Sequence, residues 1–453
     1  MNKELNKGVF VVSLGCPKNF VDTEIIAGGL LVNGRELVFD PSEADIYLVS
    51  TCAFIPAARD EANSEIQHAV KWKKQHRKGK IVVCGCLIQW DKSEEYRTIY
   101  PEVDVWIGVD KVEELPKMLD DLEAGKLNNT TYYRNSDPHY LYNEKTPRLQ
   151  LTVEHFAYLK IADGCNNCCT YCSIPNIRGR LRSRSIPSVV EEARNLLRNG
   201  VKELVLIAQD ITAFGADQDD VKVNLSELLR QLDELEGKFW IRLLYTHPAH
   251  FTEELMDVVA ESKHVLHYFD IPLQHINNNI LQRMNRHVTR ERIEEIIRKL
   301  RSRMPEVVIR TTFITGFPGE SEADYQELLD FVRNTKFSRL GVFGYSPEPR
   351  TPAAEFENQI PIDEANRRAA EIMSIQAEIS RQANRKLIGQ ELEVLIDEVM
   401  PGGKAFGRGY LDAAEIDSGV MIDCGKKRVK AGRFCQVKIT GGGKHDLSGK
   451  LVR

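Results

Sequence analysis

The sequence of 453 residues has no apolar run that approaches the roughly 20 residues needed to span a bilayer. Its first residues, MNKELNKGVFVV, carry charge and only a short apolar stretch, so they lack the apolar length and the cleavage site of a signal peptide. An excess of positive charge is also missing, because 61 Lys and Arg against 66 Asp and Glu leave a net charge of −5. We therefore expect a cytoplasmic protein without a membrane contact, and one that does not hold nucleic acid by a bulk positive field.

Cysteine, by contrast, is well represented, with ten residues in the chain. The cytoplasm keeps thiols reduced, so these residues need an explanation other than disulfides. The stretch Cys165-Asn-Asn-Cys168-Cys169-Thr-Tyr-Cys172 is far denser than chance, and the other cysteines are scattered at positions 16, 52, 84, 86, 424 and 435.

The first part of the chain, residues 1–140, alternates short apolar runs with helical stretches. The apolar runs are 9–12, 45–49 and 80–83, and the helical stretches are 23–31 and 57–75. Apolar strands separated by helices predict an open parallel α/β sheet with helices on both faces. The polar, turn-rich segment 127–138 predicts a linker or an exposed excursion.

Two further domains follow from the rest of the pattern. Residues 148–385 hold six strand candidates with helices between them, which predicts a partial (βα)6 barrel resembling a TIM barrel. These strand candidates are 157–161, 203–208, 239–245, 265–271, 307–314 and 339–345. A long charged helix at 362–387 precedes residues 386–453, whose short strands and many glycines predict a small all-β barrel.

Three cysteines in the first domain share one setting. Cys16, Cys52 and Cys86 each come directly after an apolar strand and a small residue. Because ligand sites of open α/β sheets form beyond the carboxyl ends of the strands, these thiols can meet at one point. Three cysteines suit an iron–sulfur cluster with one open iron, whereas structural zinc takes four ligands. Cys84 lies inside a strand and should face another way. The alternative is three buried small hydrophobic residues.

The dense cysteine loop, residues 165–172, offers two arrangements of ligands. Cys165, Cys169 and Cys172 can present three thiolates from one tight loop to a cubane cluster whose fourth iron stays open. The competing arrangement pairs Cys165 with Cys168 and Cys169 with Cys172, as in zinc sites. Zinc knuckles have a spacer between the two pairs, and this loop has none.

The spacing Cys165-x3-Cys169-x-Tyr171-Cys172 resembles the motif of the radical S-adenosylmethionine (SAM) enzymes, including the aromatic residue before the third cysteine. The resemblance implies a [4Fe-4S] cluster whose open iron is chelated by SAM. Its reduction would cleave SAM to methionine and a 5′-deoxyadenosyl radical. Cys168 would then occupy a variable position and would not be a ligand.

The whole chain resembles one branch of that superfamily, the methylthiotransferases. These have an N-terminal domain with three cysteines, a radical SAM partial barrel and a C-terminal TRAM domain, an OB-like barrel. The resemblance implies that Cys16, Cys52 and Cys86 hold a second, auxiliary [4Fe-4S] cluster associated with sulfur delivery.

Within this branch the chain resembles the enzymes that act on ribosomal protein S12. The stretches that carry the resemblance include SLGCPKN at 13–19, RGRLRSR at 178–184, AQDITAFG at 208–215, LYTHP at 244–248, DIPLQH at 270–275 and YSPEPRTP at 345–352. One departure is Ala414, where that branch commonly has proline. The resemblance implies a 3-methylthio-aspartate product, made from two SAM, with S12 free or in the small subunit as partner. It also implies a low-potential electron donor, no tRNA and a monomer.

Two other functions stay open at this point. The first is a tRNA adenosine methylthiotransferase with the same clusters. The second, from another class, is a non-catalytic, zinc-stabilised RNA-binding protein.

Other residues carry weaker predictions. Gln209 and Asp210 end the second barrel strand, where they would contact SAM or substrate, or simply hydrogen-bond the loop. Gly316 would let the backbone approach an adenine or ribose, with Glu320 beside it. A strand-to-helix turn capped by that glutamate explains both residues nearly as well.

In the last domain, Glu415 and Asp417 suggest an acidic edge that would dock a basic ribosomal protein. Cys424 and Cys435 are not expected to be ligands.

Overall fold

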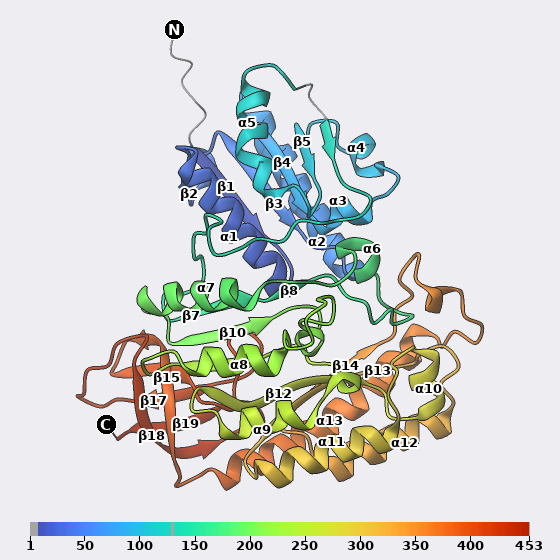
Figure 1. Cartoon of the computed structure of the whole chain (residues 1–453), viewed down its shortest axis with the longest axis vertical. Coiled ribbons are helices and arrows are strands. Elements are labelled where there is room, and N and C mark those ends of the chain that lie inside the picture. Colours follow the sequence, from blue (N-terminus) through green and yellow to red (C-terminus); the bar gives the residue numbers. More distant parts are fainter. Residues whose placement is uncertain (1–7, 128–130, 453) are drawn as a thin grey trace. The chain divides into compact units, whose positions relative to one another are not determined.

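The computed structural model describes residues 8–127 and 131–452 (Figure 1). It forms two compact units. The first holds the chain up to 151 together with 162–166 and 172–184, and the second holds 152–161, 167–171 and the chain from 185 onward. Within the described residues, every helix is too short or too polar to cross a bilayer.

The first unit is built on a six-stranded parallel sheet, which confirms the predicted open α/β domain. Its strands, in spatial order, are β2 (Glu36–Val38), β1 (Gly8–Ser13), β3 (Ile46–Thr51), β4 (Lys80–Gly85), β5 (Val105–Ile107) and β6 (Thr131–Tyr133). The segment 127–138, predicted to be a linker or an exposed excursion, also contains the short strand β6, which pairs with β5. Residues 128–130 of that segment lie outside the described residues.

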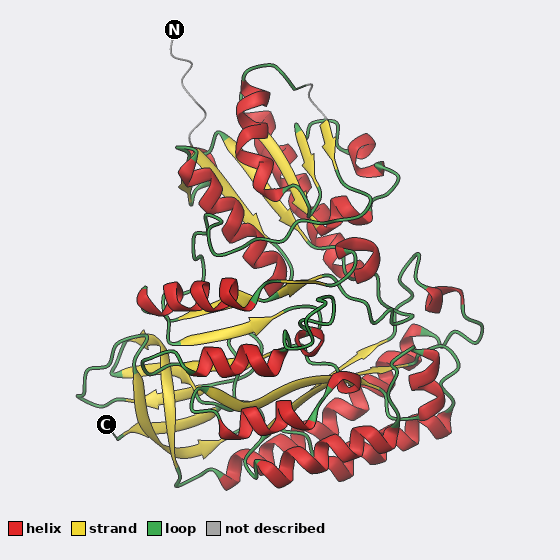
Figure 2. Cartoon of the chain, viewed as in Figure 1, coloured by secondary structure: helices red, strands yellow, loops and turns green. Residues whose placement is uncertain are grey.

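Helices cover both faces of this sheet (Figure 2). They are α1 (Pro17–Val32), α2 (Pro56–Gln75), α3 (Cys86–Trp90), α4 (Glu95–Ile99), α5 (Leu115–Glu123) and, from later in the chain, α6 (Ile174–Arg178). One apolar core joins α1 and α5 to the sheet and includes Cys84, and the other joins α2 and includes Cys86. The prediction that these two cysteines face different ways is therefore confirmed.

The second unit holds a six-stranded parallel sheet whose strands match all six predicted segments. In spatial order they are β14 (Arg339–Gly344), β13 (Val308–Thr315), β12 (Val265–Gln274), β11 (Trp240–Leu243), β10 (Glu203–Ile207) and β7 (Phe156–Lys160). The two-residue strands β8 (Ala162–Asp163) and β9 (Arg182–Ser183) pair with each other in the first unit.

Seven α-helices of the described chain accompany these strands, and all but α13 begin at a residue whose side chain caps the first turn. They are α7 (Ile186–Arg198), α8 (Leu225–Asp233), α9 (Glu253–Glu261), α10 (Asn278–Arg283), α11 (Arg290–Arg303), α12 (Glu322–Thr335) and α13 (Ile362–Lys386). Ser185, Asn224 and Thr252 each accept a hydrogen bond from a first-turn N–H of α7, α8 and α9. Such caps satisfy amide groups that the helix itself leaves unpaired.

The last part of the chain forms a closed five-stranded barrel, as predicted. Its strands are β15 (Glu391–Met400), β16 (Lys404–Arg408), β17 (Val420–Asp423), β18 (Phe434–Gly442) and β19 (Leu447–Leu451). Alternate residues of these strands fill its apolar core, including Val394, Ile396, Val420 and Ile422.

The loop after β16 packs against the central sheet, which takes Asp417 out of the predicted acidic docking edge, whereas Glu415 is exposed. The Tyr158 hydroxyl donates to Oε2 of Glu415 at 2.7 Å, and the Tyr268 hydroxyl donates to Oδ2 of Asp417 at 2.5 Å. Asp417 is also paired with Arg310, and its side chain is only 5% exposed. Both carboxylates therefore serve the contact between the barrel and the sheet.

Candidate functional site

Cys16, Cys52 and Cys86 follow β1, β3 and β4, which are neighbours in one parallel sheet. The loops converge beyond the carboxyl ends of these strands, as ligand sites of such sheets do. Gly15 has a φ of +93°, and a Cβ at this position would lie 2.9 Å from Sγ of Cys52. The backbone that carries Cys16 is thus pressed against the Cys52 side chain.

The three thiols have different electrostatic surroundings. Burial raises the pKa of Cys16, but the charges of Lys18 and Arg178 and the N–H groups of α1 outweigh it, so this pKa is lowered. Cys16 stands at the N-terminal end of α1, where a helix favours negative charge. Burial raises the pKa of Cys52, and it raises that of Cys86 to about 12.

The donor set fits an iron–sulfur cluster better than structural zinc. Cys16 raises the pKa of Cys52, and both raise the pKa of Cys86, which places the three thiols within electrostatic reach. Among the described residues near them, Cys84 belongs to the opposite core and cannot complete a four-thiolate zinc site. Three thiolates leave one iron of a cubane open to another ligand.

Replacing Gly15 with alanine is expected to prevent iron from loading at these three cysteines. The added methyl group would lie 2.4 Å from Cβ of Cys52, so that side chain must move. Gly34 is the matched control, because its φ is +84° with no atom within 4 Å of a built Cβ. Both alanines share a backbone strain of about 1–2 kcal/mol. Iron and acid-labile sulfide per chain measure the difference, and equal loading in both variants would contradict the packing argument.

The dense cysteine loop contains two adjacent cysteines that face opposite ways. Cys168 is exposed and has a φ of +49°, whereas Cys169 is buried. The Cys165 N–H donates to the carbonyl of Gly179 at 3.1 Å. Cys165 and Cys172 belong to the first unit and Cys169 to the second. The exposure of Cys168 is consistent with the prediction that it is not a ligand.

Two residues shortly after α10, Asn285 and Arg286, contact the part of this loop that contains Cys168 and Cys169. The Arg286 guanidinium lies 3.5 Å from Sγ of Cys169, and the Asn285 amide donates to the carbonyl of Cys168 at 2.9 Å. Burial lowers the pKa of Arg286, but Tyr171 and Cys169 outweigh it and the pKa is raised. The sequence did not single out Arg286, and its only signal is a positive charge within an otherwise polar turn.

Asp210 anchors the same loop from the end of β10. Its Oδ2 accepts hydrogen bonds from Asn167 and His250, each at 2.8 Å, and its Oδ1 accepts from the N–H of Thr212. Burial raises the pKa of Asp210, but the His250 hydrogen bond and the nearby histidines lower it to about 2. Asp210 is therefore a carboxylate that fixes the cysteine loop. Gln209, its neighbour, also follows β10, two residues beyond the end of that strand.

Asp210, His247 and His250 offer ligand atoms within 4.8 Å of one another. Distance alone would allow a cation, but hydrogen bonds already use both Asp210 oxygens. Nδ1 of His247 accepts from the N–H of Ala249, so its Nε2 carries the hydrogen. Burial and Arg286 lower the pKa of His247 to about 2, which keeps it neutral. We assign this group to hydrogen bonding.

The remaining predicted residues lie at the turn after β13. Glu320 is buried, and its Oε2 accepts from the N–H of Gly316 at 2.8 Å, while Arg368 pairs with its other oxygen. Tyr171 packs edge-on against Phe317, with ring centroids 6.4 Å apart. The Glu320 carboxylate thus stabilises this turn, and the Tyr171 ring packs beside it.

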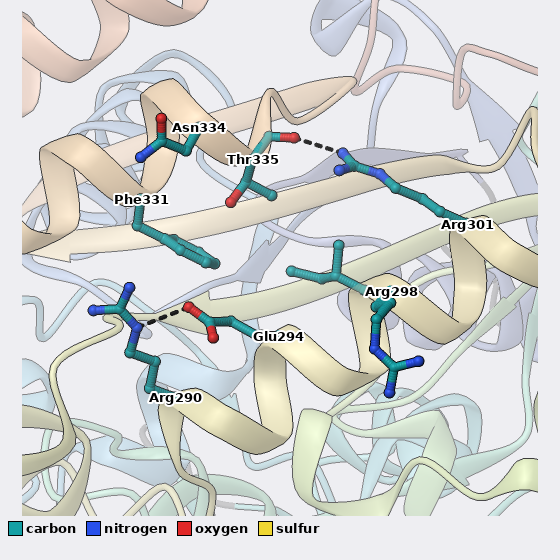
Figure 3. Close-up of a pocket in the computed structure, with 8 residues that line it drawn as sticks. Arg290, Glu294, Arg298, Arg301, Phe331, Asn334 and Thr335 are labelled. Carbon is teal, nitrogen blue, oxygen red and sulfur yellow. Dashed lines mark hydrogen bonds and ion pairs between the residues drawn. The ribbon is translucent and has the colours of Figure 1, made fainter.

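A surface pocket of about 530 Å³ lies between α11 and α12 (Figure 3). Arg290, Arg298 and Arg301 border it, and Glu294 pairs with the first of these. Neither helix carries a residue predicted for the site. The pocket is therefore not part of the predicted site.

Three family models match successive parts of the chain. The model of the Radical SAM superfamily matches residues 159–332, that of Uncharacterized protein family UPF0004 matches 8–108, and that of the TRAM domain matches 388–452. The dense cysteine loop lies in the first match, and the three N-terminal cysteines lie in the second.

Curated relatives match over nearly the full length. A protein of Desulfitobacterium hafniense named ribosomal protein uS12 methylthiotransferase RimO is 39% identical, covering 99% of each chain. The protein of the same name from Desulforamulus reducens is 42% identical, covering 98% of this chain and 99% of its own. Among solved structures, the radical SAM methyltransferase TsrM of Kitasatospora setae gives a TM-score of 0.58 at 15% identity, over 77% of this chain and 75% of its own. That likeness shows the fold alone.

Proposed function

The chain belongs to the ribosomal protein uS12 methylthiotransferase family of radical SAM enzymes, and on this premise we propose that it adds a methylthio group to the β-carbon of an aspartate in that ribosomal protein. The reaction would consume two SAM molecules. It would use two [4Fe-4S] clusters, one that binds SAM and one auxiliary.

The observation that carries the proposal is the presence of two separate sets of three cysteines. Cys16, Cys52 and Cys86 follow three neighbouring strands, and Cys165, Cys169 and Cys172 share one loop. In each set a buried arginine lies within 3.5 Å of one thiol: Arg178 near Cys86 and Arg286 near Cys169. A positive charge beside a cysteine favours its thiolate, which is the form that ligates a cluster.

Each set would have its own task. When bound, the cluster of the dense loop supplies the electron that cleaves SAM into methionine and a 5′-deoxyadenosyl radical, and the auxiliary cluster supplies sulfur. Cys16 contributes a thiolate that the end of α1 stabilises. Asp210 holds the dense loop through Asn167.

The residues proposed to contact SAM are those at the carboxyl ends of the central strands. They are Tyr171, Gln209, Asp210, Gly316 and Glu320. Glu320 would act through the turn, because it fixes the Gly316 N–H. Gly316, with a φ of +71°, presents backbone where a Cβ would clash with Ala365.

The proposed radical chemistry fits a protein substrate. A β-carbon of aspartate is not acidic enough for a side-chain base to deprotonate, whereas a primary carbon radical can abstract its hydrogen. The enzyme would work as a single chain in the cytoplasm with a low-potential electron donor, on ribosomal protein uS12, free or in the small subunit. Neither tRNA nor a membrane would take part. Its domains would divide at residues 1–140, 148–385 and 386–453.

The test is anaerobic reconstitution with iron and sulfide, followed by reduction with dithionite in the presence of SAM. A peptide carrying the aspartyl loop of uS12 is the substrate, and the same peptide with alanine for aspartate is the control. We expect methylthio addition to the first peptide only, together with 5′-deoxyadenosine, by mass spectrometry.

Two outcomes would overturn the proposal. Methylthiolation of tRNA adenosine, with intact uS12 and its peptide unmodified, would favour the tRNA alternative. Zinc in place of iron and sulfide would favour the non-catalytic protein.

A further inference from the structure

Arg178 is a buried cation that joins three separated parts of the first unit. It ends α6, and it is 2% exposed. Its Nη1 donates to Oδ2 of Asp22 at 2.6 Å and to Oδ2 of Asp163 at 3.2 Å. Its Nη2 donates to Sγ of Cys86 at 3.2 Å.

The positions of these partners connect the arginine to both cysteine sets. Asp22 lies on α1, the helix that Cys16 begins. Asp163 ends β8, two residues before Cys165. A buried arginine needs paired anions, and two carboxylates satisfy that need without any thiol. The contact with Cys86 therefore goes beyond what burial alone requires.

We propose that Arg178 is a positioning residue that donates a hydrogen bond to the Cys86 thiolate of the auxiliary cluster and thereby raises the reduction potential of that cluster. This rests on the proposed function, because it takes the cluster at Cys16, Cys52 and Cys86 as given. A hydrogen bond and a positive charge at a ligating sulfur stabilise the reduced, more negative cluster. The same guanidinium holds α1 and β8 in register with Cys86.

The shape of the guanidinium also supports a role for Arg178 in setting the cluster potential, beyond packing alone. Arg178 donates to Asp22 and Asp163 from Nη1 and to the sulfur from Nη2, whereas lysine carries all its donors on one nitrogen, so it would keep the charge but lose part of the geometry. The equivalent lysine variant therefore separates charge from hydrogen bonding. Arg180, two residues on, is exposed and offers a matched control in the same segment.

The experiment uses the full chain with Cys165, Cys169 and Cys172 replaced by alanine, so that only the auxiliary cluster remains. Its midpoint potential is measured by redox titration followed by electron paramagnetic resonance. In this background, Arg178→Gln is expected to make reduction about tenfold less favourable, which is 59 mV for one electron. Arg178→Lys should give a smaller shift, and Arg180→Gln should give none.

The outcomes distinguish a failure of this proposal from a failure of the proposed function on which it rests. A parent chain that holds no cluster would overturn the proposed function. A cluster whose potential is the same in Arg178→Gln and Arg180→Gln would overturn the role of Arg178 alone. Should Arg178→Gln fail to fold, Asp22→Asn combined with Arg178→Gln removes one uncompensated carboxylate, and the difference in its potential from Asp22→Asn alone isolates the effect of Arg178.

Discussion

Replacing Cys169 with alanine is expected to abolish SAM cleavage and peptide methylthiolation, whereas replacing Cys168 with alanine leaves both nearly unchanged. The two residues are adjacent, but Cys169 is buried beside Arg286 and Cys168 is exposed. A cubane cluster held by three thiolates loses a corner when one of them is removed, and SAM then has no iron to chelate. The measurement is 5′-deoxyadenosine released per chain after reduction, with iron content determined in parallel.

The pair of variants also tests the zinc alternative. A tetrahedral site of Cys165, Cys168, Cys169 and Cys172 would lose its metal in both variants, because each removes one of four ligands. An iron content that is unchanged in Cys168→Ala and lower in Cys169→Ala therefore supports the three-cysteine arrangement. Equal loss of metal in the two variants would refute it.

Replacing Glu203 with glutamine is expected to destabilise the second unit by about 3–5 kcal/mol, the usual cost of removing one partner from a buried ion pair. Glu203 is fully buried at the start of β10, where its carboxylate pairs with Arg242 at 2.6 Å and with Arg408 of the C-terminal barrel. Arg408 also pairs with Asp397. Removing the charge on Glu203 leaves two buried guanidinium groups with too little negative charge around them.

Urea denaturation of the reconstituted protein measures the loss of stability in Glu203→Gln. A second ion pair between the central sheet region and the C-terminal barrel provides the control. Lys238 of the central part pairs with Glu393 of the barrel, but its side chain is 63% exposed. Exposed pairs contribute little, so Glu393→Gln should leave the midpoint nearly unchanged. Similar midpoints for the two variants would show that the buried pair does not hold the barrel in place.

The same carboxylate gives a pH dependence with a definite sign. Burial raises the pKa of Glu203, but Arg408 and Arg242 outweigh it, so the pKa in the folded protein is lowered. The unfolded chain then binds the proton more readily than the folded protein. The contribution of Glu203 to stability is therefore fully present above the ordinary pKa of glutamate, and it is lost as the pH falls from there through the lowered pKa of the folded state. In Glu203→Gln the decline of the urea midpoint below about pH 4.5 should be shallower than in the parent.

The sequence determined the elements that repeat with a clear period. Apolar runs with helices between them predicted the parallel sheets, and all six central strands lie where they were expected. It missed β2, β5 and β6, which have three residues each. Runs this short carry too few alternations to define a strand, and only pairing with a neighbour stabilises them.

The two sets of cysteines also differ in how far the sequence alone could predict them. Spacing within one loop, together with the family resemblance, predicted the set at 165, 169 and 172. The set at 16, 52 and 86 could be proposed from the strand ends, but the order of β1, β3 and β4 in the sheet is what brings their loops together. A sequence records which residues follow strands, and the hydrogen-bonded order of those strands decides which loops meet.

Tertiary structure alone decided the roles of the charged residues. Glu415 and Asp417 suggested a free acidic edge, yet Tyr158 and Tyr268 of the central sheet hydrogen-bond them. Arg178 carried no more signal than the arginines around it, and it becomes distinctive through its contacts with Asp22, Asp163 and Cys86. The partner of a charge depends on which distant segments pack against it and exclude water, and no local pattern of the chain records that.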